Sequence, residues 1–207
     1  MYRPAAFAED DPAAHRALIA AYPLGTVVTM GPGGLCATPL PFLLEECAEG
    51  VRLLAHLPRA NPLANTQGEA PALIIFNGPA AYISPGWYPT KAETGRVVPT
   101  WNYVTAHAHG HLTIIDDAAF VRRQINALTH QQEARRPQPW ALSDAPVDYA
   151  ETLLTSLVGL SFAVERLEGK WKLSQNQPQR NRQGVIDGLR AEGNTAMAAL
   201  MTRPDHR

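Results

Sequence analysis

The chain has 207 residues, of which 45% are hydrophobic and 18% charged, and these globular values exclude an intrinsically disordered chain. Its formal net charge of -1 argues against a basic nucleic-acid-binding surface over the whole domain. No apolar run approaches the roughly 18 residues of a membrane-spanning helix, and no signal peptide is recognised. We therefore expect one soluble, cytoplasmic domain over residues 1–207 with no membrane partner, in which Cys36 and Cys47 are buried, reduced thiols.

The first third of the chain is predicted to begin with a helix and to continue as a β-hairpin. Asp10-Asp11-Pro12 is typical of a helix start, and the helix is expected to end near Pro23. The following stretches indicate a strand at 24–30, a turn at 31–34, a returning strand at 35–44, a third strand at 51–56 and a short helix or loop at 61–66.

The middle of the chain is predicted to be rich in strands. Short strands are expected at 72–76 and 80–84, joined by a hairpin turn at Asn77-Gly78. Proline and glycine punctuate 85–96, which indicates a surface loop. Residues 98–115 are expected to form a long strand, either continuous or broken at Gly110.

The last third mixes helices and strands. Asp116-Asp117 should cap a helix that runs to about Glu133, and a second helix is expected at 149–157. Strands at 160–167 and 170–175 are predicted to be joined by a turn at Glu168-Gly169, followed by a helical extension over about 178–207. Many short strands linked by hairpins favour a mainly β, α+β fold: an antiparallel barrel with flanking helices.

Two stretches combine large aromatics with small hydrogen-bonding side chains: Val98 to Tyr103 and Lys172 to Asn176. Flavin mononucleotide (FMN) has a flat ring to stack, a polar edge, a hydroxylated chain and a phosphate, so it suits such surroundings. Strand alternation places Thr100 and Asn102 on one face and Trp101 on the other. Plain sheet packing is the alternative, but an asparagine inside an apolar strand needs hydrogen-bond partners, which a flavin would supply.

Several blocks of the sequence resemble the PaiB-like family of FMN-binding negative transcriptional regulators. The similar blocks are Met1-Tyr2-Arg3-Pro4-Ala5-Ala6-Phe7, His56 to Pro62, Phe76 to Tyr88, Val98 to Tyr103 with His107, and Lys170 to Asn176. The resemblance implies an FMN-binding split β-barrel that forms a homodimer, with a regulatory or DNA partner. With the residue patterns, it gives these candidate cofactor-binding residues: His56, Arg59, Asn61, Thr100, Trp101, Asn102, Lys172, Ser174, Gln175 and Asn176.

Two cationic side chains are candidates for the flavin phosphate. Arg59 follows a predicted strand and precedes a helix start at Asn61-Pro62, where free backbone N–H groups and a guanidinium can bind an anion. An exposed loop arginine is the alternative. Lys172 shares a strand face with Lys170 and Ser174, which is either a cofactor-binding face or a solvated one.

His107, His109 and His111 alternate along the predicted long strand and therefore share a face, so a metal or haem site is a minority alternative. Pro39 stands where the family usually has a histidine, in a strand that split barrels lay along the flavin. A proline there indicates an edge strand or a bulge and puts the pose of the flavin in question.

Three functions remain open from the sequence. The first is an FMN-binding split-barrel protein with a regulatory role, and the second is a flavin oxidoreductase that uses a nicotinamide donor. The third is a DNA-binding repressor without flavin, which is weakened because the run from Gln179 to Arg182 is the one modest basic candidate. No catalytic residue is assigned.

Overall fold

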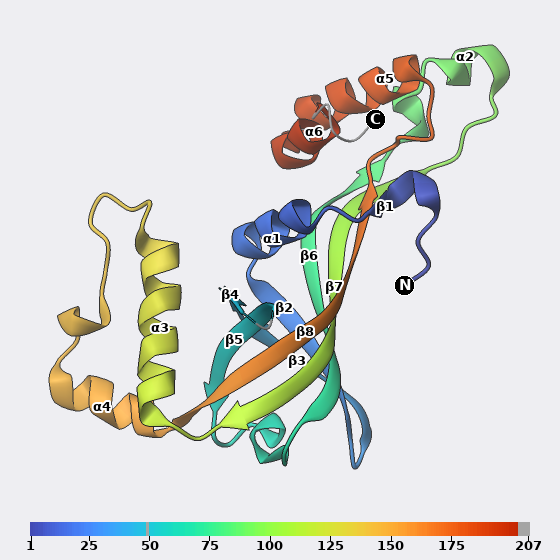
Figure 1. Ribbon diagram of the computed structural model, residues 1–207. Helices are drawn as coiled ribbons and strands as arrows, with labels where there is room; N and C mark the ends of the chain where they lie inside the picture. The colour runs from blue at the N-terminus through green and yellow to red at the C-terminus, as the bar shows by residue number, and fades with distance from the viewer. Residues whose placement is uncertain (49, 203–207) are drawn as a thin grey trace. The chain divides into compact units, whose positions relative to one another are not determined.

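The computed structural model describes residues 1–48 and 50–202 (Figure 1). The strands are β1 (Ala8–Glu9), β2 (Leu24–Gly31), β3 (Gly34–Pro41), β4 (Leu43–Cys47), β5 (Gly50–Pro58), β6 (Ala70–Ile83), β7 (Thr100–Ile115) and β8 (Leu157–Lys172). The α-helices are α1 (Pro12–Ala21), α2 (Thr90–Thr94), α3 (Ala118–Glu133), α4 (Val147–Thr155), α5 (Gln179–Ala191) and α6 (Thr195–Thr202). The described residues also form four short 3₁₀ helices: η1 (Ala5–Phe7), η2 (Pro62–Asn65), η3 (Pro85–Trp87) and η4 (Leu142–Asp144).

The strands form one open, eight-stranded antiparallel sheet. They are hydrogen-bonded in the order β3-β2-β6-β7-β8-β5-β4, and β1 pairs with β8. The sheet does not close, so β3 and β4 end the path. The expected split-barrel class, mainly β with flanking helices, is confirmed.

The chain divides into two compact units. Unit 1 comprises Met1–His15, Asn77–Ala106 and the chain from Glu168 onward, and unit 2 comprises Arg16–Phe76 and His107–Leu167. The long strands β6, β7 and β8 contribute residues to both units.

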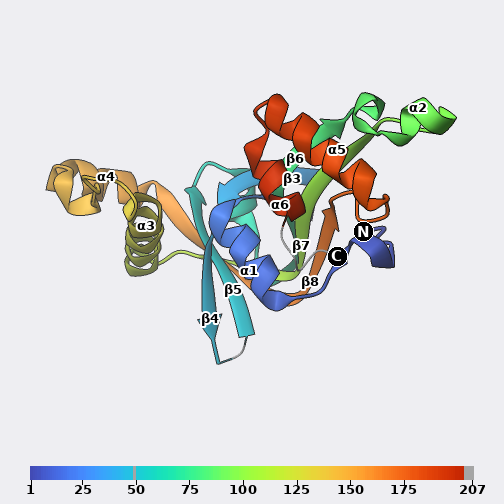
Figure 2. The same ribbon diagram turned by 90° about the horizontal axis from the view of Figure 1, so that it is seen from above.

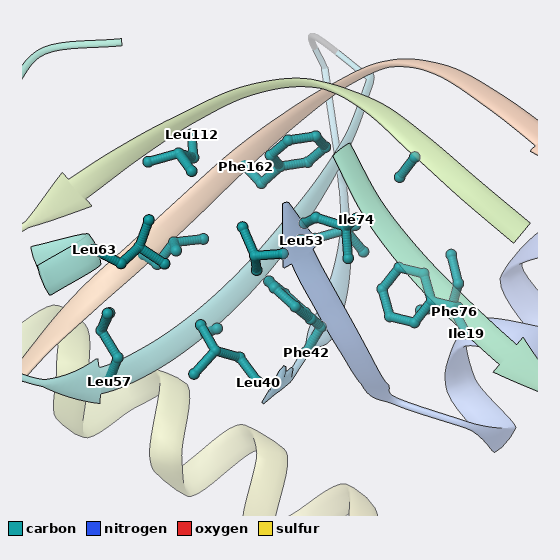
Figure 3. Packing of buried hydrophobic residues seen from close by; sticks show 14 of the residues in the cluster. Ile19, Leu40, Phe42, Leu53, Leu57, Leu63, Ile74, Phe76, Leu112 and Phe162 are labelled. Atoms are coloured by element: carbon teal, nitrogen blue, oxygen red, sulfur yellow. The ribbon is translucent and has the colours of Figure 1, made fainter. Parts of the chain in front are cut away.

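Unit 2 contains a continuous apolar core between its strands. Phe42 and Phe76 are fully buried and meet edge to face, with ring centroids 5.7 Å apart. Leu53 of β5 and Ile74 of β6 point into the same interior (Figure 3). Because apolar side chains alternate along these strands, each strand turns one face to this core.

Helix α3 of unit 2 begins where the sequence predicts. Asp117 is the N-cap, and its carboxylate accepts a hydrogen bond from the Ala119 N–H at 2.8 Å. The helix buries Val121 and Leu128, and it lies beside α4 in both views (Figures 1 and 2).

In unit 1, α5 packs closely on the segment that follows β6. A Cβ atom on Gly184 would lie 2.1 Å from the Trp87 carbonyl oxygen, and one on Gly188 would lie 2.4 Å from the Trp87 ring. Glycine is therefore required at both positions. Arg180 adds two hydrogen bonds to the Glu93 carboxylate, at 2.6 and 2.7 Å.

Two predicted turns are wrong because β6 and β8 each run unbroken. Asn77-Gly78 lies inside β6, and neither residue has the positive φ that a type I′ turn needs. Gly169 lies inside β8 opposite Glu9 of β1, and a Cβ there would lie 2.4 Å from the His15 ring. Both glycines therefore belong to strand interiors.

Three smaller differences concern loops and thiols. The expected surface loop at 85–96 contains η3 and α2 and buries Tyr88. Strand β7 is not broken at Gly110, where a Cβ would lie 1.9 Å from the Ala163 carbonyl oxygen. Both cysteines are free thiols, but Cys36 is exposed because it lies on the end strand β3.

Helices α5 and α6 occupy the C-terminal range expected to be helical as far as Thr202, and the rest of that range, 203–207, lies outside the described residues. Helices α5 and α6 pack against each other (Figures 1 and 2). Within the described chain, no helix has the length and apolar character needed to cross a membrane.

Candidate functional site

Unit 1 presents an exposed aromatic surface where β7 begins. Trp101 is 57% exposed, and its ring meets Tyr82 of β6 at a centroid distance of 6.0 Å and an angle of 73°. Two exposed large rings side by side mark a candidate contact surface, because burying them would release free energy. Because the two rings meet edge to face, one of them can lie parallel to a planar partner while the other borders its edge.

Lys172 supplies a cation beside this surface. Its ammonium group donates hydrogen bonds to the Thr100 hydroxyl and to the Trp101 carbonyl oxygen, the latter at 2.8 Å. Burial is the main cause that lowers the pKa of Lys172, and the nearby Lys170 lowers it further, whereas Tyr103 opposes the shift. An anion bound here would stabilise the charged form of Lys172 and would itself be neutralised.

Asn102 points to the opposite face of β7 and is fully buried. Its amide Nδ2 donates to the Ser174 hydroxyl at 3.0 Å and lies 3.6 Å from the Met201 sulfur of α6. The protein itself therefore provides partners for this amide, and a cofactor role for Asn102 stays a prediction. Asn102 ties the start of β7 to α6.

The segment after β8 is a tight turn and not the last part of a strand. Ser174 has a φ of 61°, in the left-handed region that few non-glycine residues adopt. The Gln175 side chain folds back, accepting from the Leu173 N–H at 2.7 Å and donating to the Trp171 carbonyl at 2.6 Å. Asn176 is exposed in this turn. The turn thus places Ser174 under Asn102 and leaves Asn176 facing solvent.

Lys170 extends the cationic edge of unit 1. Its ammonium lies 5.3 Å from the Tyr103 ring centroid and 5.6 Å from that of Tyr2, and it donates to the Tyr2 carbonyl at 3.1 Å. Tyr103 and Trp101 occupy alternate positions of β7, so aromatic rings follow one face of this strand.

The other candidate residues lie in unit 2 and have protein partners. His56 Nδ1 lies 2.7 Å from the Gln124 side-chain oxygen. Asn61 caps η2, accepting from the Leu63 N–H at 3.0 Å. Each of these two side chains thus stabilises its own local structure, and a cofactor role for them stays a prediction.

Arg59 forms a two-pronged ion pair with Asp116. The Arg59 Nη1 donates to Asp116 Oδ2 at 2.8 Å, and Nη2 donates to Asp116 Oδ1. The Arg59 Nε donates to the Thr155 carbonyl at 2.8 Å. The hydrogen bond from Arg59 is the main cause that lowers the pKa of Asp116, and the same bond raises the pKa of Arg59. A phosphate at Arg59 would compete with this carboxylate, and its binding there stays a prediction.

The histidine row, defined as His107, His109 and His111, lies on β7, and Pro39 lies on β3. His107, His109 and His111 are half-buried at alternate positions of β7, and His111 pairs with Glu165 at 2.9 Å. Pro39 belongs to β3 and lies opposite Thr26 of β2. Because β3 ends the sheet path, the expected edge strand is confirmed.

The residues at the start of β7 fit a flavin in their chemistry. Trp101 would stack on the ring and Tyr82, edge to face with Trp101, would border it. Lys172 and Thr100 would provide a cation and a hydroxyl to an anionic or carbonyl edge. Tyr82, Tyr103 and Lys170 were not among the candidates predicted from the sequence. The alternation of Trp101 and Tyr103 within 98–103 was the available signal for Tyr103.

Comparisons with known proteins show the family of this chain. The family model described as “Putative FMN-binding domain” matches residues 1–166. An uncharacterized protein of Emericella nidulans is 35% identical over 95% of this chain and 93% of its own length. The protease synthase and sporulation protein PAI 2 of Bacillus subtilis is 30% identical over 86% of this chain and 84% of its own length.

Among solved structures, the FAD and heme binding protein from Mycobacterium smegmatis has the same fold. The two superpose with a TM-score of 0.58 at 18% identity, covering 80% of this chain and 73% of that one.

Proposed function

This chain belongs to the FMN-binding domain family and is an FMN-binding split-barrel protein, and from this premise we propose that it acts as a flavin-dependent negative regulator of transcription. FMN, when bound, supplies a planar ring that accepts electrons and an anionic phosphate. The observation that carries the proposal is the aromatic surface of Trp101 and Tyr82 beside Lys172.

The role of each residue follows from its chemistry. Trp101 binds the ring by stacking on one of its faces, and Tyr82, which meets Trp101 edge to face, excludes water from the ring edge. Lys172, held by Thr100 and the Trp101 carbonyl, neutralises negative charge on the flavin edge or the phosphate. Ser174, Gln175 and Asn102 position this lysine by fixing the turn that follows β8.

A regulatory role is supported by a connection from this surface to the C-terminal helices. Trp101 lies on the surface, and the next residue, Asn102, contacts Ser174 and Met201 of α6. Ligand binding at Trp101 would thus bias the packing of α6 through one buried hydrogen-bonded group. The name of the Bacillus subtilis relative, which refers to protease synthesis and sporulation, also supports a regulatory role.

The direct DNA contact of such a regulator would not come from the basic run in α5. Arg180 pairs with Glu93, Asn181 exchanges hydrogen bonds with Thr90, and Arg182 donates to the Met201 carbonyl at 3.3 Å. These side chains hold α5 in place. We propose that regulation works through a second protein or through a different surface.

We also propose that the protein works as a homodimer in the cytoplasm. An open sheet whose path ends at β3 leaves a strand edge that a second chain can cover. The exposed side chains of Tyr2 and Val98 in unit 1 support a further buried contact. Light scattering at micromolar concentration checks this, and a monomer that retains FMN would contradict it.

The absorption spectrum of purified protein is the first test of the proposed function. Flavin bands are expected, whereas a Soret band would favour the haem alternative. NADH oxidation by the FMN-loaded protein then tests the oxidoreductase alternative, and turnover no faster than that of free FMN is expected.

A deletion strain tests the regulatory step itself. Transcripts that rise on deletion should return to normal with the wild-type gene and not with a Trp101→Ala gene expressed at the same level. Full repression by Trp101→Ala protein that lacks flavin would separate regulation from FMN. An unchanged transcriptome on deletion would contradict the regulatory role.

A further inference from the structure

The histidine row of β7 is not used by the proposed function. His107, His109 and His111 belong to the part of β7 in unit 2, and all three are half-buried and so reachable from solvent. Ala108, between the first two histidines, and Leu112, directly after the third, are fully buried in the core. The strand therefore fixes the backbone beneath the imidazoles and turns all three to the same face.

Strand geometry decides which of these histidines can share one ion. A strand rises about 3.4 Å per residue, so neighbours in the row start about 7 Å apart and His107 and His111 about 14 Å apart. Zinc–imidazole bonds are about 2.0–2.1 Å long, so one ion can bridge neighbours in the row and not its two ends.

His107 and His109 already face each other. Their ring centroids are 6.3 Å apart, and each offers a ring nitrogen within 4.8 Å of the other's. Two nitrogens bound to one tetrahedral ion lie about 3.4 Å apart, so small rotations about the side-chain bonds are sufficient. His111 is held by Glu165 instead, at 2.9 Å.

We propose that His107 and His109 form a chelating site for a borderline divalent transition metal, of the Zn²⁺, Ni²⁺ or Cu²⁺ class, on the surface of unit 2. Neutral imidazole nitrogens prefer these ions, whereas Mg²⁺ and Ca²⁺ prefer oxygen ligands. Two protein ligands leave the other coordination positions to water or to a small ligand, as in open metal sites.

Zinc titration with a chromophoric competitor tests the site. The protein is used with Cys36→Ser and Cys47→Ser, so that thiols do not bind the metal, and both cofactor-free and FMN-loaded protein are titrated. About one Zn²⁺ per chain is expected at micromolar affinity, and Mg²⁺ should not compete. His107→Gln and His109→Gln should each weaken binding by at least about tenfold.

His111→Gln is the matched control, because it removes an imidazole from the same face of the same strand. Its zinc affinity should stay within about twofold of the parent, and thermal melts in EDTA should show that all three variants fold. Unchanged affinity in the His107→Gln, His109→Gln double variant would overturn the proposal. An equal loss in His111→Gln would also overturn it, because the metal would then not distinguish the pair.

Paramagnetic Ni²⁺ gives a second, independent reading. Substoichiometric Ni²⁺ should broaden the imidazole NMR signals of His107 and His109 before those of His56 or His130. Broadening that begins at another histidine would contradict the assignment.

Discussion

Asn102 of β7 and Ser174 in the turn after β8, 72 positions apart in sequence, hydrogen-bond to each other through fully buried side chains at 3.0 Å. Each of the two side chains thus has its hydrogen-bond partner within the protein. The pair instead fixes the strand end that carries Trp101 and the turn that carries Lys172. Asn102 and Ser174 therefore form a buried structural pair. Trp101 and Lys172 are the pair proposed to contact the ligand.

Asn102→Leu is expected to destabilise the cofactor-free protein. The substitution leaves the Ser174 hydroxyl without its partner, which costs about 1–3 kcal/mol. Urea unfolding of the apo form measures this cost, and Asn176→Leu, a change of the exposed amide in the same turn, should cost under about 0.5 kcal/mol. An unchanged apo stability together with weaker FMN binding would make Asn102 a cofactor ligand.

Lys172→Met is expected to change how stability depends on alkaline pH. Burial lowers the pKa of Lys172 in the folded state from its ordinary value of 10.5. The unfolded chain therefore holds more protons between the two pKa values, so wild-type stability gains a contribution as pH rises through this window. The variant should lack that contribution in unfolding curves from pH 8 to 10.5, whereas Lys91→Met on the exposed helix α2 should keep it. Identical curves for Lys172→Met and wild type would show that this lysine is not perturbed.

Arg59→Ala is expected to weaken FMN binding more than riboflavin binding, if Arg59 leaves Asp116 to bind the phosphate. A charge-assisted contact of this kind is worth about 1.5–3 kcal/mol, or about one to two decades in affinity. Arg122, which pairs with Glu151 at similar exposure, supplies the control Arg122→Ala. Equal affinities of both ligands for Arg59→Ala and wild type would leave Arg59 with a structural role alone.

Gly188→Ala is expected to loosen α5 from the segment after β6. The new methyl would meet the Trp87 ring at 2.4 Å, and such overpacking costs about 1–3 kcal/mol. Gly33→Ala is the matched control, because no atom lies within 4 Å of its Cβ position. Thermal melts of both variants should show a clear loss for Gly188→Ala alone, and equal melting temperatures would contradict the packing described here.

Local signals in the sequence predicted the helices well. Asp116-Asp117 predicted a helix cap, and α3 begins after the N-cap Asp117 and ends at Glu133, as expected. The long strands were divided wrongly, because Gly78 and Gly169 carry turn chemistry in isolation. Gly169 is glycine because His15 and Trp171 approach its backbone, and local sequence does not reveal such an approach.

Only the part of the candidate site that depends on local sequence was predicted. Strand alternation predicted that Asn102 and Trp101 lie on opposite faces of β7, and the structure shows that Asn102 takes the buried face. It did not reveal that Ser174 adopts a positive φ, or that Arg59 meets Asp116, since both depend on chain segments far apart in sequence.

Flavin titration of Trp101→Ala tests whether FMN binds at the aromatic surface of Trp101 and Tyr82. Fluorescence of FMN and of riboflavin is followed as wild type, Trp101→Ala and Trp140→Ala are added, the last removing a tryptophan of comparable exposure in unit 2. Loss of ring stacking at about 0.5–1.5 kcal/mol should weaken binding of both ligands to Trp101→Ala by about two- to tenfold, with Trp140→Ala unchanged. Wild-type affinity of Trp101→Ala for both flavins would contradict the placement of the cofactor on this surface.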